Sequence, residues 1–321
     1  MDKAQRLEAI DQFRGFAILL MVLANFLFGV ENLPPWMKHA PGVGLTVVDL
    51  IAPFFIFAIA LTYPLSWRHR LKADGAKRAA EHFFVRYAAI AGIGFFLTII
   101  DHSVEPGPWK EPWGVLQAIG AAGLLTLVVI AVSWPWRLLA GLAILGGYLF
   151  LLQAYWMDNV KHASHGGMRG ALAWGAMLIL GTVLADLYHA GEKGRRLFPL
   201  AGAAVLMAGA VLAVWFPVSK VWVSASYVLV SLGISALVFK GFDLLSERLD
   251  VRSAVLSAWG RNPLALYLLH IVLLGAFVLP GSPGWYALAP HWLTALQALA
   301  LLSVLSAVGL GLVRKGWTLS L

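Results

Sequence analysis

The sequence predicts an all-α, polytopic membrane protein: a helical bundle with both chain ends in the cytoplasm. Three observations support this prediction. Of the 321 residues, 60% are hydrophobic, only 12% are charged, and the mean hydropathy is +0.79. Soluble domains contain about 45–50% apolar and about 25% charged residues. Because so few charged side chains cannot cover a core in water, the surplus apolar surface must face lipid.

Short polar breaks divide the chain into about ten apolar runs, where a bilayer crossing takes about 20 residues. The expected transmembrane helices are Phe16–Val30, Leu45–Trp67, Phe84–Ile100, Gly114–Ser133, Leu138–Trp156, Gly170–Tyr188, Phe198–Phe216, Trp222–Leu244, Val255–Leu279 and His291–Val313. Proline and glycine mark the breaks between them. No linker is long or polar enough to separate two domains, so residues 1–321 are predicted to form a single transmembrane domain.

The basic residues set the predicted orientation. Of the 24 lysines and arginines, only five fall on the side opposite the N-terminus: Lys38, Lys110, Lys161, Arg169 and Lys220. Cytoplasmic loops carry such an excess of basic residues, so both termini are placed inside. The net charge of +8 is scattered between apolar runs, which argues against a nucleic-acid partner. The sequence contains no cysteine, which excludes disulfides and a cysteine nucleophile.

One acidic residue interrupts the second span. Asp49 lies five residues inside it, in GLTVVDL, and Pro53 follows four residues later. A proline in a helix interior frees a carbonyl and bends the helix, and such bends are tolerated where they line a cavity. We therefore expect Asp49 to point into a cavity. A hydrated acid at the membrane interface, or a partner for a nearby cation, is the alternative.

Polar residues of the first span and the following loop form a second group. Asp11 and Arg14 are three residues apart and share a helix face, so Arg14 either reaches lipid headgroups or anchors a ligand phosphate. Asn25 lies deep in the span, where its amide makes either a contact between helices or a contact with the substrate. His39, in PPWMKHAPG, follows in the outer loop. Histidine changes charge around neutrality, so beside Asn25 and Asp49 it is a candidate base rather than a merely solvated residue.

The ninth span, in WGRNPLALYLLH, contributes Asn262, Tyr267 and His270. His270 lies near mid-span and would be costly against lipid, so we place it inward, either as a structural or as a functional histidine. The outer His162 and His165 have no third ligand beside them, so no metal site is expected.

Five segments, in the same order along the chain, resemble the catalytic region of lysosomal heparan-α-glucosaminide N-acetyltransferase and its bacterial relatives, a family of transmembrane acyltransferases. They are RLEAIDQFRGFAILLMVLAN, KHAPGVGLTVVDLIAPFFIFAIA, GVLQAIG, SASYVLV and GRNPLALYLLH. The resemblance runs from about Arg6 to His270.

The resemblance implies an acyl-CoA-dependent N-acetyltransferase of the bacterial inner membrane. Acetyl-CoA would be the cosubstrate on the cytoplasmic side, and a glucosamine-type amino sugar would be the acceptor on the periplasmic side. A homodimer is also implied. His39 matches the catalytic position, as base or acyl carrier, while Asn25 and Asp49 match positions lining the same site. Four further positions match residues near the coenzyme: Ser224, Ser226, Tyr267 and His270.

The chemistry of acetyl transfer suggests roles for these residues. Asn25 would donate to the oxyanion, and Asp49 would orient His39 as a triad acid does. Basic cytoplasmic ends would attract the coenzyme phosphates: Arg14, Arg68, Arg70 and Arg261. We also assign Asn262 to the coenzyme. Two alternatives stand beside this function. One is a proton-coupled sugar or peptide transporter that uses Asp49 and His270, and the other is a non-catalytic membrane scaffold or sensor.

Overall fold

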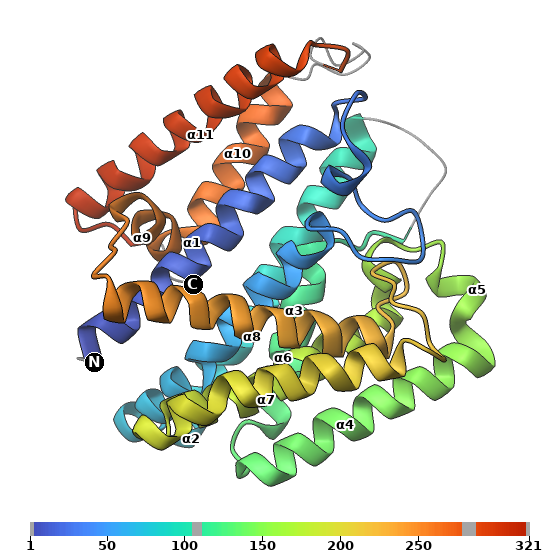
Figure 1. Cartoon of the computed structure of the whole chain (residues 1–321), viewed down its shortest axis with the longest axis vertical. Coiled ribbons are helices and arrows are strands. Elements are labelled where there is room, and N and C mark those ends of the chain that lie inside the picture. Colours follow the sequence, from blue (N-terminus) through green and yellow to red (C-terminus); the bar gives the residue numbers. More distant parts are fainter. Residues whose placement is uncertain (1–2, 105–110, 278–286, 319–321) are drawn as a thin grey trace. The chain divides into compact units, whose positions relative to one another are not determined.

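The computed structural model describes residues 3–104, 111–277 and 287–318, and the regular structure in these ranges is helical (Figure 1). In these ranges, seven helices are long and apolar enough to cross a membrane. Two shorter apolar helices accompany them, Val115–Val129 and Pro263–Gly275. The predicted all-α, polytopic membrane bundle is therefore confirmed. Two predicted details lie outside the described residues: Lys110 and the end of the ninth span at Leu279.

The α-helices follow the predicted spans with shifted ends. Their bounds are α1 Lys3–Phe28, α2 Ile51–Val104, α3 Val115–Val129, α4 Trp134–Leu151, α5 Met157–Val160, α6 Gly167–His189, α7 Gly191–Leu212, α8 Ala225–Arg248, α9 Ala254–Arg261, α10 Pro263–Phe277 and α11 His291–Arg314. Short helical turns precede, link or follow some of them: η1 Pro35–Met37, η2 Val48–Leu50, the π-helical η3 Leu152–Trp156 and η4 Ser164–Gly166.

Helix α2 contains two of the predicted spans. At Gly75 its backbone turns to φ 81° and ψ 170°, which is not helical. Glycine adopts a positive φ without the steric cost of a side chain. The chain reverses there, beside the label α2 at the lower left of Figure 1. The rings of Tyr63 and Tyr87, one in each half, stack with centroids 5.4 Å apart and planes inclined by 4°. The two halves therefore form a helical hairpin.

The prediction of one continuous helix over Val255–Leu279 is wrong. The chain breaks at Asn262, where φ is −126° and ψ is 48°, and α9 and α10 lie on either side. The cause is Pro263, which has no N–H to donate and disfavours the helical conformation in the residue before it. This break places Asn262 between two helices rather than within one.

The chain divides into two compact units. One contains Met1–Ala40, Thr46–Phe55 and Val238–Leu321, and the other contains Pro41–Leu45 and Ile56–Leu237. The first unit combines segments from both ends of the sequence, whereas the second is continuous apart from Pro41–Leu45. The single domain over 1–321 stays a prediction.

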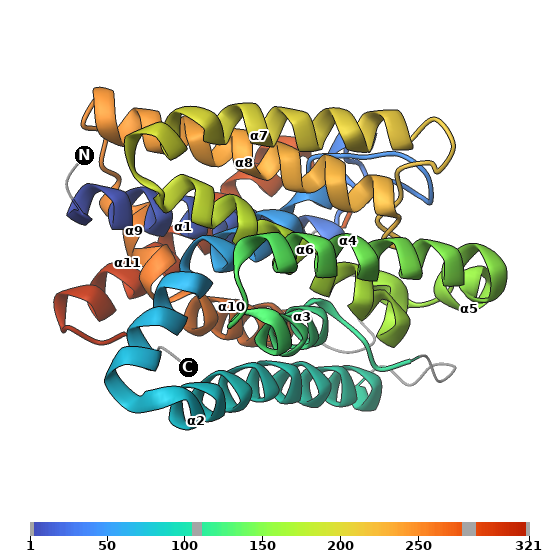
Figure 2. The same cartoon turned by 90° about the horizontal axis from the view of Figure 1, so that it is seen from below.

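In the second unit α6 is the central helix. It contacts α3, α4 and α7, and 78% of the residues in its apolar stretch are buried. Helices α7 and α8 run side by side (Figure 2), and the backbone of Gly209 approaches Val230 closely. Small residues permit such close approach between membrane helices, where packing replaces the hydrophobic effect as the driving force.

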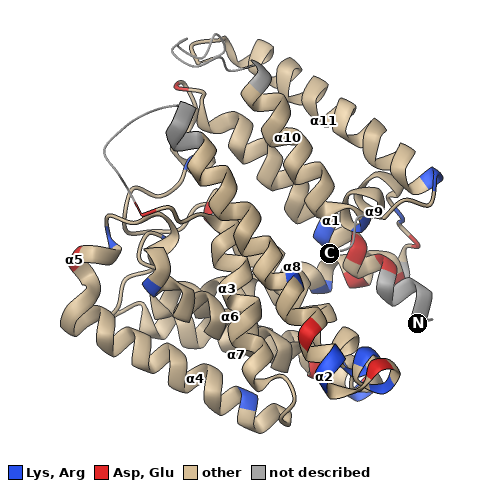
Figure 3. Cartoon of the chain, turned by 180° about the vertical axis from the view of Figure 1, so that it is seen from behind, with Lys and Arg blue, Asp and Glu red and all other residues tan. Residues whose placement is uncertain are grey.

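The helix ends of this unit agree with the predicted alternation of spans. Arg68 and Arg137 both bond to Asp186, which brings together three ends predicted to be cytoplasmic. The hydroxyl of Tyr148, near the end of α4, donates to the carbonyl of Trp222, at the predicted start of the eighth span, at 2.7 Å. Figure 3 shows basic residues gathered around the turn of α2. Which compartment each face occupies stays a prediction.

In the first unit α1 packs against α9, α10 and α11. The approach to α9 is close enough to exclude side chains: a Cβ on Gly15 would lie 1.9 Å from the carbonyl oxygen of Leu256. A Cβ on Gly260 would lie 1.8 Å from that of Asp11. The indole N–H of Trp259 donates to Ser306 at 3.0 Å and joins α9 to α11. Helix α9 is therefore fixed between α1 and α11.

We expect Gly15→Ala to lower the thermal unfolding temperature in detergent, because the new methyl group meets backbone that cannot move aside. Overpacking of this kind typically costs about 1–3 kcal/mol. The matched control is Gly92→Ala on α2, where a Cβ would meet nothing within 4 Å. If both variants unfold at the wild-type temperature, the close approach of α1 and α9 is refuted.

Candidate functional site

A histidine–aspartate pair forms the centre of the candidate site. The Nδ1 atom of His39 lies 2.7 Å from Oδ1 of Asp49. The imidazole side chain is 42% exposed, whereas the carboxylate is fully buried. An ionised carboxylate can only accept hydrogen bonds, so Nδ1 carries the hydrogen and Nε2 is the nitrogen that can take up a proton. The pair has the geometry of a base held in one tautomer by an acid.

Three further donors hold the carboxylate of Asp49. Its Oδ2 accepts from the N–H of Ala40 at 3.2 Å and from the N–H of Thr46 at 2.9 Å. The hydroxyl of Thr46 donates to the same oxygen at 3.0 Å. Asp49 lies in η2, the helical turn that leads into α2, where the dipole of a helix N-terminus favours negative charge. Burial of this charge is therefore compensated on both oxygens.

The predicted depth of Asp49 needs a correction. Helical structure begins at Val48, so Asp49 lies at the mouth of the span rather than five residues inside it. Pro53 is the third residue of α2, where a proline removes no needed hydrogen bond, and the bend expected there stays a prediction. The proline inside α2 is Pro64.

A second polar group joins α1 to α10. The Nδ2 atom of Asn25 lies 2.9 Å from Nε2 of His270, across 245 positions of the sequence. His270 is fully buried, as expected for an inward-facing residue, and the ring of Tyr267 packs edge-on against it at 4.9 Å. An amide carries two N–H donors, so the bond to His270 leaves Asn25 able to donate a second.

Arg14 lies in an ion-pair network at the other end of α1. Its guanidinium donates to Asp11 at 3.3 Å and to the carbonyl of Gly260 at 3.1 Å. Arg261 pairs with Glu8 at 3.3 Å and with Asp11 at 3.5 Å. Two acids thus balance the two arginines. The network ties α9 to α1, and its attraction for a phosphate is weaker than that of two unpaired guanidiniums.

Comparison with known proteins identifies the family to which this chain belongs. The family model described as "Heparan-alpha-glucosaminide N-acetyltransferase, catalytic" matches residues 6–212. The chain belongs to this family. The family match includes Arg14, Asn25, His39 and Asp49 and ends before Ser224.

Two curated relatives of this acetyltransferase family are similar to part of the chain. The human heparan-alpha-glucosaminide N-acetyltransferase is 34% identical over 130 residues, which cover 40% of this chain and 19% of that protein. The mouse protein of the same name is 30% identical over 134 residues, or 41% of this chain and 20% of that protein. The similarity thus spans about a fifth of the length of each relative.

Ser224 and Ser226, expected near the coenzyme in this acetyltransferase family, lie in the second unit at the start of α8. Ser224 Oγ accepts from the N–H of Ser219 at 3.0 Å and from that of Tyr227 at 3.2 Å. Ser226 donates to the carbonyl of Phe216 at 2.6 Å. The two hydroxyls therefore cap α8 and hold the preceding turn. A serine directly before a helix is an N-cap signal, so this role of Ser224 is readable from the sequence.

Asn262 is fully buried at the break between α9 and α10. Its carbonyl accepts from the N–H of Leu266 at 3.1 Å and so begins α10. The assignments of Asn262, Ser224 and Ser226 to the coenzyme stay predictions. Among the described residues, no three His, Cys, Asp or Glu side chains gather as a metal site would require.

We expect Asp49→Ala to loosen the loop around His39. The N–H groups of Ala40 and Thr46 would lose their acceptor, and a hydrogen bond to a charged group contributes about 1.5–3 kcal/mol. Amide hydrogen exchange at these two positions should therefore quicken by about tenfold or more. Asp158→Ala is the control, because that acid is exposed and pairs with Lys161. Equal exchange in wild type and Asp49→Ala would show that the carboxylate does not hold the loop.

Proposed function

We propose that this chain is a membrane N-acetyltransferase that transfers an acetyl group from cytoplasmic acetyl-CoA to the amine of a glucosamine-type sugar on the opposite side. The observation that carries the proposal is the exposed imidazole of His39 bonded through Nδ1 to the buried carboxylate of Asp49. The human and mouse relatives, both heparan-alpha-glucosaminide N-acetyltransferases, support the reaction and the acceptor class.

The proposed chemistry begins with a proton. An amino sugar is mostly protonated near neutrality and becomes a nucleophile only when it loses that proton. Nε2 of His39 takes it, and Asp49 stabilises the resulting imidazolium, the role of the acid in a catalytic triad. The amine nitrogen then bonds to the thioester carbonyl carbon. As the tetrahedral intermediate collapses, the carbon–sulfur bond breaks, and the coenzyme leaves as a thiolate that takes up the second proton released by the amine nitrogen.

Asn25 supports the same step. Its second amide N–H would donate to the oxyanion of the intermediate, a contribution worth about 3–4 kcal/mol where such a donor has been removed from other enzymes. The bond from Asn25 to His270 fixes the direction of the amide. Asn25 is therefore oriented before the substrates arrive.

We place the proposed path of the coenzyme along α1 and α10. Arg14 contacts Gly260 near the start of the α9–α10 segment, and Asn25 contacts His270 farther along it. From Arg14 to Asn25, α1 advances by eleven residues, which at about 1.5 Å per residue is about 16 Å along the helix axis. A coenzyme with its phosphates near Arg14 would lie extended between these points, with Asn262 and Tyr267 along its course. We include Ser224 and Ser226 in this proposal only through the family resemblance.

The transporter alternative required Asp49 and His270 to act as one proton relay. In the structure Asp49 is bonded to His39, and His270 is bonded to Asn25. No observation favours transport over acetyl transfer. The homodimer and the bacterial inner membrane stay predictions from the resemblance.

We expect His39→Ala to retain coenzyme binding and to lose acetyl transfer by about 10²–10⁴-fold, the usual contribution of a general base. Asp49→Asn should lose transfer in the same range, because an amide no longer fixes the tautomer or stabilises the imidazolium. The measurement is transfer from labelled acetyl-CoA to glucosamine by the purified protein in detergent, with coenzyme affinity titrated separately.

His162→Ala is the matched control for this experiment, since it removes another exposed histidine and should leave transfer unchanged. Wild-type transfer by His39→Ala would exclude His39 as the base. Absence of transfer by the wild-type protein to any amino sugar would overturn the proposed function itself.

A base that only moves a proton leaves no covalent trace. Incubation of the wild-type protein with labelled acetyl-CoA in the absence of acceptor should therefore give no acetylated His39 after rapid denaturation. Mass spectrometry of the peptide that contains His39 checks this expectation. An acetyl-histidine that disappears on addition of glucosamine would establish His39 as an acyl carrier instead.

A further inference from the structure

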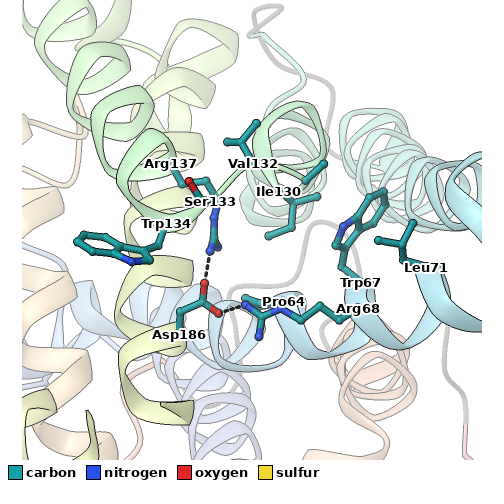
Figure 4. A pocket seen from close by; sticks show the side chains of 11 residues that line it. Pro64, Trp67, Arg68, Leu71, Ile130, Val132, Ser133, Trp134, Arg137 and Asp186 are labelled. Atoms are coloured by element: carbon teal, nitrogen blue, oxygen red, sulfur yellow. Dashed lines mark hydrogen bonds and ion pairs between the residues drawn. The ribbon is translucent and has the colours of Figure 1, made fainter.

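The second unit contains a pocket lined by Arg68, one of the four arginines expected from the sequence to attract the coenzyme phosphates. The end of the first half of α2, the turn between α3 and α4, and α6 enclose a cavity of about 410 Å³ (Figure 4). Its polar side chains are Arg68, Ser133, Arg137 and Asp186, and the walls include Trp67 and Trp134. Cavities of this size class bind small molecules.

The charges in the pocket do not balance. Two guanidinium groups meet a single carboxylate, because Arg68 and Arg137 both bond to Asp186 (Figure 4). The side chain of Arg137 is only 3% exposed, and it also donates to the hydroxyl of Thr182 at 2.8 Å. The pocket therefore carries one surplus positive charge, and an anion would compensate it.

One donor in the pocket lacks an acceptor. The Nε atom of Arg137 is buried and makes no hydrogen bond within the described part of the chain. A buried donor left unsatisfied costs about 1–3 kcal/mol, and more when the group is charged, so native structures rarely retain one. This orphaned guanidinium N–H is the independent sign of an absent acceptor.

The start of α4 adds to the positive field. Ser133 precedes this 18-residue helix, and its side chain makes no capping hydrogen bond. Pro135 has no N–H, and the N–H groups of Trp136 and Arg137 donate to the carbonyl of Ser133, so here the helix dipole rather than free N–H groups favours an anion. Ser133 and Trp134 both line the pocket, so this helix start faces the same space as Arg137.

The walls indicate where the anion comes from. Trp134 is 54% exposed and Trp67 is buried, and the remaining wall residues include Ile130 and Val132. Tryptophan is enriched at the depth of lipid headgroups. The three helix ends around the pocket are those predicted to be cytoplasmic, and basic pockets at such ends bind anionic headgroups.

We propose that this pocket binds the phosphate of an anionic phospholipid from the cytoplasmic leaflet. The phosphate oxygens accept from the exposed guanidinium of Arg68, the buried guanidinium of Arg137 adds positive charge, and the apolar part of the lipid lies along Trp134. A free phosphate ester offers the same oxygens but not the acyl chains, and the experiment separates the two.

The test compares Arg68→Gln with Arg70→Gln. Arg70 lies two positions along the same helix, pairs with Asp74 at 3.2 Å, and does not line the pocket. The purified full chain in neutral detergent is titrated with phosphatidylglycerol and with phosphatidylcholine, and bound lipid is counted by native mass spectrometry. Wild type and Arg70→Gln should bind phosphatidylglycerol in preference to phosphatidylcholine. Arg68→Gln should bind it about tenfold more weakly, through the loss of one charge-assisted bond.

Two further arms identify the source of the phosphate. Inorganic phosphate and coenzyme A, each added in excess, should not displace phosphatidylglycerol. Displacement by either would overturn the lipid assignment in favour of a free phosphate or of the coenzyme. If Arg68→Gln unfolds at a lower temperature without lipid, Trp134→Ala replaces it, because that side chain is exposed. Unchanged lipid preference in the folded variant would refute the site.

Discussion

The hydrogen bond between His39 and the buried Asp49 is the constraint on which the proposed site depends. A buried carboxylate without partners is so unfavourable that the chain must supply donors around it. Here the donors come from both sides of one loop, at Ala40 and Thr46, and from His39 itself. The interactions that make the charge tolerable thus also fix the imidazole tautomer. The buried charge of Asp49 therefore determines both the structure of the loop and which nitrogen of His39 can accept a proton.

The packing of α1 extends this constraint to the proposed substrate path. Gly15 and Gly260 let α1 and α9 approach until backbone meets backbone, and Arg14 bonds to the carbonyl of Gly260 at the same crossing. Farther along α1, Asn25 bonds to His270 on α10. Because both ends are fixed, the direction of the Asn25 amide is set by helix packing rather than by the substrate. Such preorganisation is what makes an oxyanion donor effective.

The sequence predicted the membrane bundle because composition and span length depend only on local residues and on lipid as a solvent. The predicted ninth span was wrong because the Asn262–Pro263 step interrupts a hydrophobic run and divides the helix there. The dipeptide itself signals a turn. The contact of His39 with Asp49 is local and could be suggested from spacing. The contact of Asn25 with His270 joins residues 245 positions apart, and no pattern within one sequence reveals it. The ion pair of Arg14 with Asp11 is local, but the pairing of Arg261 with Glu8 and Asp11 is tertiary in the same way as the Asn25 contact.

The positions of the polar groups also account for the proton balance of the proposed reaction. An ammonium and a thioester give an amide, a thiol and one released proton. In the proposal His39 receives this proton, and because its 42% exposed ring lies in a loop, not within a helix, the proton could pass to water. In the proposal the coenzyme would return as a thiol to the side from which it came. A base inside a span would instead have to move a charge through low dielectric at each turnover, at a cost of several kcal/mol. The position of Asp49 at the mouth of its helix is therefore the better arrangement for transfer across a bilayer.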